Sequence, residues 1–196
     1  MRNNNIVKMV QVAILMAIIV VLQLLSYVIK IGTFNLSLVL IPIVVGAVMF
    51  GPKTGAWLGF VFGAVVTACC ISGMDVGGAI LWNANPFLTA AICLIKGTAA
   101  GWVAGLIATA FKNSRTPWVG IVLAALAAPV VNTGLFLVGL STCFYPVLVA
   151  WAGGQEILYY VVFGLVGINF IIEFALNAIL SPTVTAIVKA LKKTNR

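Results

Sequence analysis

The chain has 196 residues, of which 63% are hydrophobic and only 7% are charged. This composition excludes a soluble globular domain, whose apolar share is about half. The formal net charge of +8 does not indicate a nucleic-acid partner, because in a membrane protein the positions of the basic residues matter more than their sum. No polar segment is long enough to fold alone, so we expect a single domain in a lipid bilayer over residues 1–196.

Apolar runs bounded by Gly, Pro, Asn and charged residues predict six transmembrane helices. In chain order the expected spans are 6–29, 36–50, 54–72, 86–111, 118–144 and 160–190. They are expected to be helices because a bilayer admits only helices and closed barrels, in which every backbone polar group is paired. The first run is too long for a signal peptide and is expected to be retained. The predicted fold class is therefore an all-α integral membrane protein.

The basic residues predict the orientation of these spans. An even number of spans places both termini on one side, together with the turns after the second and fourth spans. The basic residues assigned to that side are Arg2, Lys8, Lys53, Lys112, Arg115, Lys189, Lys192, Lys193 and Arg196. Because cytoplasmic loops carry the excess of Lys and Arg, this side and both termini are expected to be cytoplasmic. The loops around 30–35, 73–85 and 145–156 then face outside.

The stretch GAVMFGPKT, residues 46–54, differs by one residue from a nucleotide-binding P-loop. A P-loop has Lys directly after its second Gly, whereas here Pro52 separates Gly51 from Lys53. The stretch also joins two expected membrane helices rather than a strand and a helix, and the chain has just three acidic residues. We therefore interpret it as a helix break and expect no ATP hydrolysis by this chain.

Small residues recur every fourth position on three expected spans. Two runs consist of glycine: 51, 55, 59 and 63 on the third span, and 97, 101 and 105 on the fourth. Such small-xxx-small runs allow close approach of helix backbones, and we expect both to pack inside this chain's own bundle. The first span carries one step of alanines, Ala13 and Ala17, among bulky side chains. That step alone is weak evidence for a contact.

Two ionisable residues lie deep inside apolar spans, Lys96 on the fourth and Glu173 on the sixth. Each costs about 2.5–3.5 kcal/mol at the centre of a membrane helix, so each needs a partner or a function. Their opposite charges permit a pair. Asn169, Glu173 and Asn177 are four residues apart and form a polar stripe, and Asn132 adds an amide on the fifth span. Either these groups form a structural network or they line a binding cavity.

The segment ILWNANPF before the fourth span is expected to be a loop at the outer mouth of the bundle. Trp82 offers a stacking surface or an interfacial anchor, Asn83 and Asn85 offer amides, and Pro86 starts the next helix. An aromatic ring beside amides suits a small polar organic molecule. The four cysteines lie in apolar runs and are expected to be buried thiols, and the chain has no histidine. We expect no catalytic residue, metal or cofactor.

The pattern of spans and motifs resembles the substrate-binding membrane subunits, or S components, of energy-coupling factor transporters. The motifs that carry the resemblance are the Ala13-x-x-x-Ala17 step, LVLIPIVVGAVMFGPKTGAWLGFVFG, WNANPF, LIKGTAAGWVAGL, APVVNTGLFLVG and NFIIEFALNAILSP. The resemblance implies capture of a vitamin from outside a bacterial cytoplasmic membrane. It implies as partners a coupling transmembrane protein, contacted by Ala13 and Ala17, and two cytoplasmic ATPases.

The resemblance also implies which residues bind the ligand. The outer ends of spans and loops would supply Trp82, Asn83, Asn85 and Asn132. Lys96, Asn169 and Glu173 are further candidates from the polar groups inside the spans, and Lys96 and Glu173 either contact the ligand or support the residues that do. A cationic Lys96 suits the carboxylate of pantothenate, which is the first candidate vitamin, ahead of riboflavin or folate. Two alternatives stay open: an autonomous membrane facilitator or small channel, and a membrane enzyme or assembly factor.

Overall fold

A computed structural model of the chain describes residues 4–28, 30–31, 34–35, 38–165 and 167–194. The described part is almost entirely helical, as expected for an all-α membrane protein. Its helices are α1 (Asn4–Val28), α2 (Leu40–Phe50), α3 (Pro52–Ser72), α4 (Val76–Ala84), α5 (Pro86–Ala110), α6 (Pro117–Cys143), α7 (Tyr145–Ala152), α8 (Ile157–Tyr159) and α9 (Gly167–Thr194). A π-helical stretch, η1 (Tyr160–Leu165), follows α8, and β1 (Lys30–Ile31) pairs antiparallel with β2 (Phe34–Asn35).

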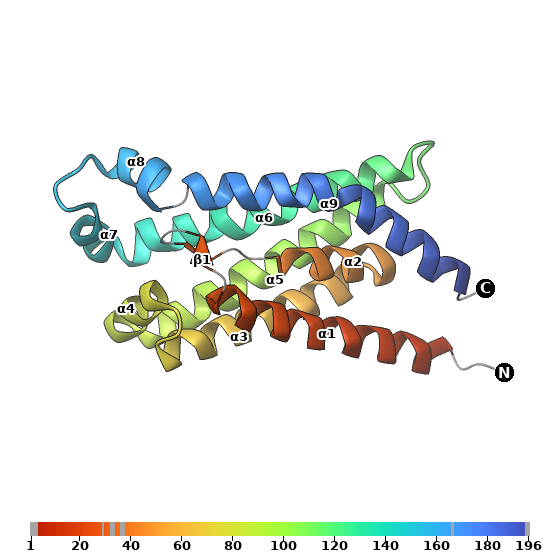
Figure 1. The fold of residues 1–196 in the computed structure, drawn as a ribbon, viewed down its shortest axis with the longest axis horizontal. Helices are drawn as coiled ribbons and strands as arrows, with labels where there is room; N and C mark the ends of the chain where they lie inside the picture. The colour runs from red at the N-terminus through yellow and green to blue at the C-terminus, as the bar shows by residue number, and fades with distance from the viewer. Residues whose placement is uncertain (1–3, 29, 32–33, 36–37, 166, 195–196) are drawn as a thin grey trace.

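The long helices lie lengthwise beside one another (Figure 1). The beginning of α1, the end of α9, the α2–α3 turn and the α5–α6 turn all lie at one end of the molecule, which we name the terminal end. The short helices α4, α7 and α8 lie at the opposite end, which we name the α4 end (Figure 1). The two ends therefore differ in architecture, because these short helices lie at one end and the turns between long helices at the other.

The structure bears on the number of membrane crossings. Four described helices, α1, α3, α5 and α6, are long and apolar enough to cross a membrane. A fifth crossing is possible where α7 and the α8–η1 segment meet at 87°, and α2 and the Phe170–Ala186 part of α9 are apolar but shorter. A multi-pass protein is thus confirmed, whereas six crossings remain a prediction. With 11 residues α2 rises only about 16 Å, and its residues from Leu40 to Ala47 are mostly buried.

Three expected boundaries are wrong. The segment 145–156 was expected to be a loop, but Tyr145–Ala152 forms α7. The segment 73–85 was expected to be a loop, but most of it forms α4, because Asp75 caps that helix by accepting a hydrogen bond from the backbone N–H of Gly78 at 2.9 Å. The sixth expected span, 160–190, starts with η1, and α9 begins only at Gly167. The expected starts and ends at residues 29 and 36 fall outside the described residues.

The two glycine runs pack against each other where α3 and α5 cross. A Cβ added to Gly59 would meet the carbonyl oxygen of Gly97, and a Cβ added to Gly55 would meet that of Gly101. The same clashes arise when the Cβ is added to the glycine on α5. The backbones are therefore in direct contact, and the expected packing inside this chain's own bundle is confirmed except at Gly51, where a Cβ would meet nothing within 4 Å.

Replacing Gly59 with alanine is expected to destabilise the protein by about 1–3 kcal/mol, the usual cost of forcing extra atoms into a packed interface. The measurement is the thermal unfolding midpoint of the detergent-solubilised protein. Gly134→Ala on α6 is the matched control, because nothing lies within 4 Å of a Cβ at that position. Equal midpoints for the two variants would contradict the close α3–α5 contact.

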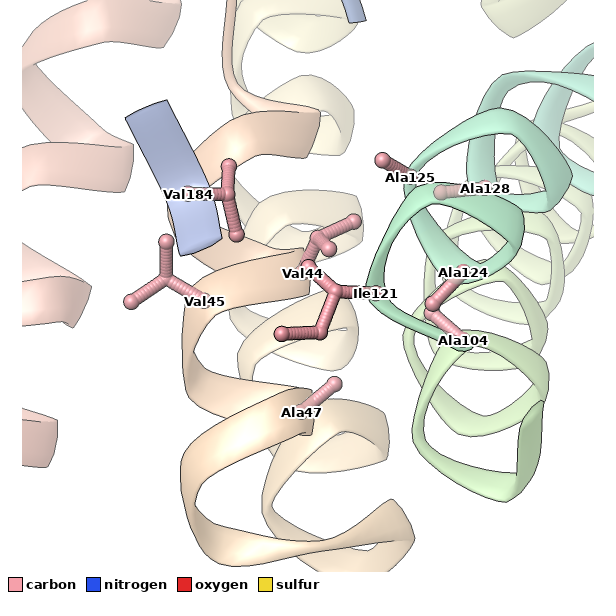
Figure 2. Close-up of a cluster of buried hydrophobic side chains, with 9 residues drawn as sticks. All are labelled: Val44, Val45, Ala47, Ala104, Ile121, Ala124, Ala125, Ala128 and Val184. Carbon is pink, nitrogen blue, oxygen red and sulfur yellow. The ribbon is translucent and has the colours of Figure 1, made fainter. Parts of the chain in front are cut away.

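A second tight contact lies nearer the terminal end, where α2, α5, α6 and α9 meet (Figure 2). Alanines dominate the α5 and α6 sides of this cluster, and β-branched residues dominate the α2 and α9 sides. Its buried members are Val44, Val45, Ala47, Ala104, Ile121, Ala124, Ala125, Ala128 and Val184. The small side chains of α6 let that helix approach α2 closely, which explains how an 11-residue helix can be held at the centre of the bundle.

Candidate functional site

A cavity of about 160 Å³ lies at the α4 end, between α3, α4, α5, α6, α7 and η1. We name it the Lys96 cavity. Its lining combines one cation, one carboxylate, a hydroxyl, two thiols and two aromatic rings with apolar side chains. These polar and aromatic lining residues are Lys96, Asp75, Thr89, Cys70, Cys93, Phe136 and Trp151.

One face of α5 supplies the largest share of this lining. Thr89, Ile92, Cys93 and Lys96 are spaced i, i+3, i+4 and i+7, so they lie on the same side of the helix. Asn85 fixes the start of α5, because its side-chain oxygen accepts a hydrogen bond from the backbone N–H of Leu88 at 3.1 Å. The helix whose face lines the cavity therefore has a capped N-terminus.

Among the described residues, Lys96 is the only basic one that lines this cavity. Its ammonium lies 4.9 Å from the centroid of the Phe136 ring, a cation–π distance. The Glu173 carboxylate interacts with it electrostatically, but the described residues include no ion pair between the two. The ammonium thus meets a ring face and the cavity rather than a carboxylate partner.

The carboxylate of Asp75 is held by the protein on both of its oxygens. Oδ1 accepts from the backbone N–H of Gly78, and Oδ2 accepts from the Tyr27 hydroxyl at 3.3 Å. The Tyr27 hydroxyl in turn accepts from the side-chain amide of Gln23 at 2.9 Å. Gln23 and Tyr27 are buried at 5% and 8% exposure. This chain of hydrogen bonds ties the end of α1 to the start of α4, which forms one wall of the Lys96 cavity.

Replacing Tyr27 with phenylalanine is expected to loosen α4. The change leaves the buried Gln23 amide without its acceptor, which costs about 1–3 kcal/mol. Hydrogen exchange measured by mass spectrometry should then show faster exchange over residues 76–84. The control is Tyr145→Phe, whose ring is 50% exposed at the same end of the molecule. Unchanged exchange over α4 in the Tyr27 variant would show that the hydrogen-bond chain does not hold this helix.

Most of the predicted ligand-binding residues do not line the Lys96 cavity. Trp82 and Asn83 are on α4 rather than in a loop; Trp82 packs against a core cluster of α1, α2, α3 and α5, and Asn83 is exposed. Asn85 caps α5. Asn132 lies one turn before Phe136 on α6, and its Oδ1 is buried without a hydrogen-bond partner in the protein.

The predicted polar stripe lies on α9. Glu173 is partly buried there, and its backbone carbonyl accepts a hydrogen bond from the side-chain amide of Asn177 at 2.8 Å. The Oδ1 of Asn177 is buried and unpartnered. The side chain of Asn169 lies outside the described residues. The stripe therefore contributes a carboxylate near Lys96 and one unsatisfied amide.

Sequence reasoning missed several lining residues. Asp75 was placed in an outer loop, and Phe136 was not singled out. The thiols of Cys70 and Cys93 were predicted only to be buried, which is confirmed, whereas Cys143 is exposed and that prediction is wrong. The signal for the α5 face was present, because stepping back three, four and seven residues from Lys96 gives the residues that line the cavity.

The Ala13–Ala17 step differs from the glycine runs in its surroundings. Both alanines are exposed on α1, along a side that also exposes bulky apolar residues such as Met9 and Ile14. Among the described residues, no helix of this chain packs over the step as α5 packs over the glycines of α3. It is a smooth patch on the outside of the bundle.

A comparison with curated proteins gave no match. The sequence profile of the family described as "ECF transporter, substrate-specific component" matches residues 7–187, a range that includes every described residue of the Lys96 cavity. The chain therefore belongs to the family of substrate-specific components of ECF transporters.

Proposed function

We propose that this subunit binds a small anionic, hydroxylated vitamin in the Lys96 cavity, with pantothenate as the first candidate. The observation that carries the proposal is the Lys96 ammonium, which lines a cavity without forming an ion pair to a carboxylate of the described protein. A charge inside an apolar bundle is costly and calls for a compensating partner. A ligand carboxylate would supply that partner through a charge-assisted hydrogen bond.

The other lining groups support a ligand of this kind. Phe136 and Trp151 offer apolar faces to a short carbon chain, while Thr89 offers a polar partner on α5. The cavity volume of about 160 Å³ favours pantothenate, because it is the smallest of the three candidate vitamins. Riboflavin and folate carry fused rings that would require the walls to move apart.

The orientation and the partners form the second part of the proposal. Described basic residues at the terminal end, Lys8, Lys53, Lys112 and Arg115, favour a cytoplasmic location for that end, and the α4 end would then face outside a bacterial cytoplasmic membrane. Family membership implies association with an energising module of a membrane coupling protein and ATPases. In this arrangement the helices cross the membrane six times, and the exposed Ala13 and Ala17 contact the coupling protein.

Mass spectrometry of small molecules that co-purify with the detergent-solubilised protein, followed by calorimetry with pantothenate, riboflavin and folate, tests the proposed ligand. We expect pantothenate to be retained and to bind more tightly than the other two. Tighter binding of riboflavin, which has no carboxylate, would contradict the role given to Lys96. Absence of submicromolar binding by any of the three would contradict vitamin capture.

A further inference from the structure

A second hollow, far from the Lys96 cavity, lies at the terminal end between the first half of α1 and the start of α3. Its volume is about 530 Å³, and we name it the α1–α3 groove. One part of its lining is polar and basic, with Lys8, Lys53 and Thr54. The remainder is apolar, with Val12, Ala13, Met16 and Trp57 among its residues. The groove is therefore amphipathic.

The basic part of the groove has no acidic residue in its lining. Lys8 and Lys53 are both exposed, and the Lys8 ammonium lies 5.7 Å from the Phe50 ring centroid. The chain's three carboxylates are elsewhere: Asp75 lines the Lys96 cavity, Glu156 precedes α8 at the α4 end, and Glu173 is on α9. Two cations from two different helices thus face one hollow without a carboxylate beside them.

The apolar part of the groove has the character of a surface that contacts lipid. Met9 and Trp57 line it and are 66% and 54% exposed. The indole of Trp57 stacks on Phe60 with ring centroids 5.5 Å apart. Tryptophan at the end of a membrane helix typically lies at the headgroup level, where an apolar ring and a polar N–H are both accommodated. The lysines and the tryptophan therefore belong to the same depth of the bilayer.

We propose that the α1–α3 groove binds an anionic phospholipid. Its phosphate would lie between the ammonium groups of Lys8 and Lys53, near the Thr54 hydroxyl. Its acyl chains would run along Met9, Val12 and Met16. Each lysine gains electrostatically from an anionic headgroup, and a bound lipid fills a hollow that is basic at one side and apolar at the other. This site is separate from the vitamin site, which lies at the opposite end of the bundle, but its lining includes Ala13, so a bound lipid and the coupling protein would occupy this surface in turn.

Native mass spectrometry of the purified protein with equal amounts of dioleoyl phosphatidylglycerol and dioleoyl phosphatidylcholine tests this site. The unaltered protein should prefer phosphatidylglycerol. The double variant Lys8→Gln/Lys53→Gln should lose most of that preference, by about fivefold for each lysine. Because both side chains are exposed, the variant should keep its unfolding midpoint, and its pantothenate affinity should equal that of the unaltered protein whatever that affinity is.

The matched control is Lys112→Gln/Arg115→Gln, which removes the same charge from the α5–α6 region at the same end but outside the groove. It should retain the preference for phosphatidylglycerol. An equal loss in the control would show a general effect of charge and overturn the site, as would full preference in the groove variant. Displacement of phosphatidylglycerol by inorganic phosphate would assign the groove to free phosphate instead and would also overturn the proposal.

Discussion

Replacing Lys96 with methionine is expected to weaken pantothenate binding about 10- to 100-fold. A hydrogen bond to a charged group contributes about 1.5–3 kcal/mol, and each 1.4 kcal/mol is about tenfold in affinity. Methionine keeps the length and much of the volume of the lysine stem but removes the charge and its interaction with Phe136. The fold should survive, because removal of a charge from a membrane helix is favourable for insertion. Calorimetry measures the affinity, and thermal unfolding measures the stability.

Two controls separate a contact with the ligand carboxylate from a general electrostatic effect. Lys96→Arg keeps the charge and should retain most of the affinity, whereas Lys112→Met, at the other end of the molecule, should have no effect. An analogue in which an amide replaces the carboxylate of pantothenate should bind the unaltered protein weakly and the Lys96→Met variant equally weakly. Such non-additive losses are expected when two groups interact directly. Additive losses would contradict the contact.

The fold could be predicted from the sequence where a physical constraint acts locally. Every described long helix lies close to an expected span, because in lipid an apolar run of this length can only be helical. The shorter elements and the helix boundaries depend on contacts with neighbouring parts of the bundle. α4 is too short and too rich in glycine to stand out from a loop, although Asp75 three residues before Gly78 is an N-cap signal. The break before α9 has no equivalent local signal in an apolar sequence.

The segment that resembles a P-loop illustrates how context decides a motif. Gly51 has φ of +91°, a conformation that favours glycine, and links the end of α2 to the start of α3. Pro52 occupies the first turn of α3 and lies against Gly105 of α5. The interpretation as a helix break is therefore confirmed. The glycine and proline serve the tight turn and the close approach of α3 to α5.

The site was less predictable than the fold. Lys96 stood out because a charge in an apolar span is costly. Phe136 could not be found in the same way, since aromatic residues are common in membrane helices and this one reaches the cavity only through the packing of α6. Of the two proposed surfaces on α1, only the alanine step could be recognised in the sequence, because the alanines stand among bulky neighbours. The groove could not be recognised, because Lys8 and Lys53 come together only in the folded bundle.

Replacing Ala17 with leucine is expected to abolish vitamin transport without affecting vitamin binding. Ala17 is exposed, so a larger side chain does not disturb this chain's own packing. At a close helix–helix contact with the coupling protein, however, the added atoms would cost about 1–3 kcal/mol, enough to weaken docking about 5- to 150-fold. The measurement is uptake of radiolabelled vitamin by liposomes that contain the complete transporter, beside calorimetry on the isolated subunit.

The control is Ala68→Leu, an equal change at an exposed alanine of α3 near the α4 end, which should leave both binding and uptake intact. Uptake that survives in the Ala17 variant would remove the coupling protein from this surface. Uptake that needs no partner at all would favour an autonomous facilitator. A loss of uptake together with binding would instead indicate a folding defect. Only loss of uptake with intact binding places the docking surface on α1, on the outside of the bundle and away from the Lys96 cavity.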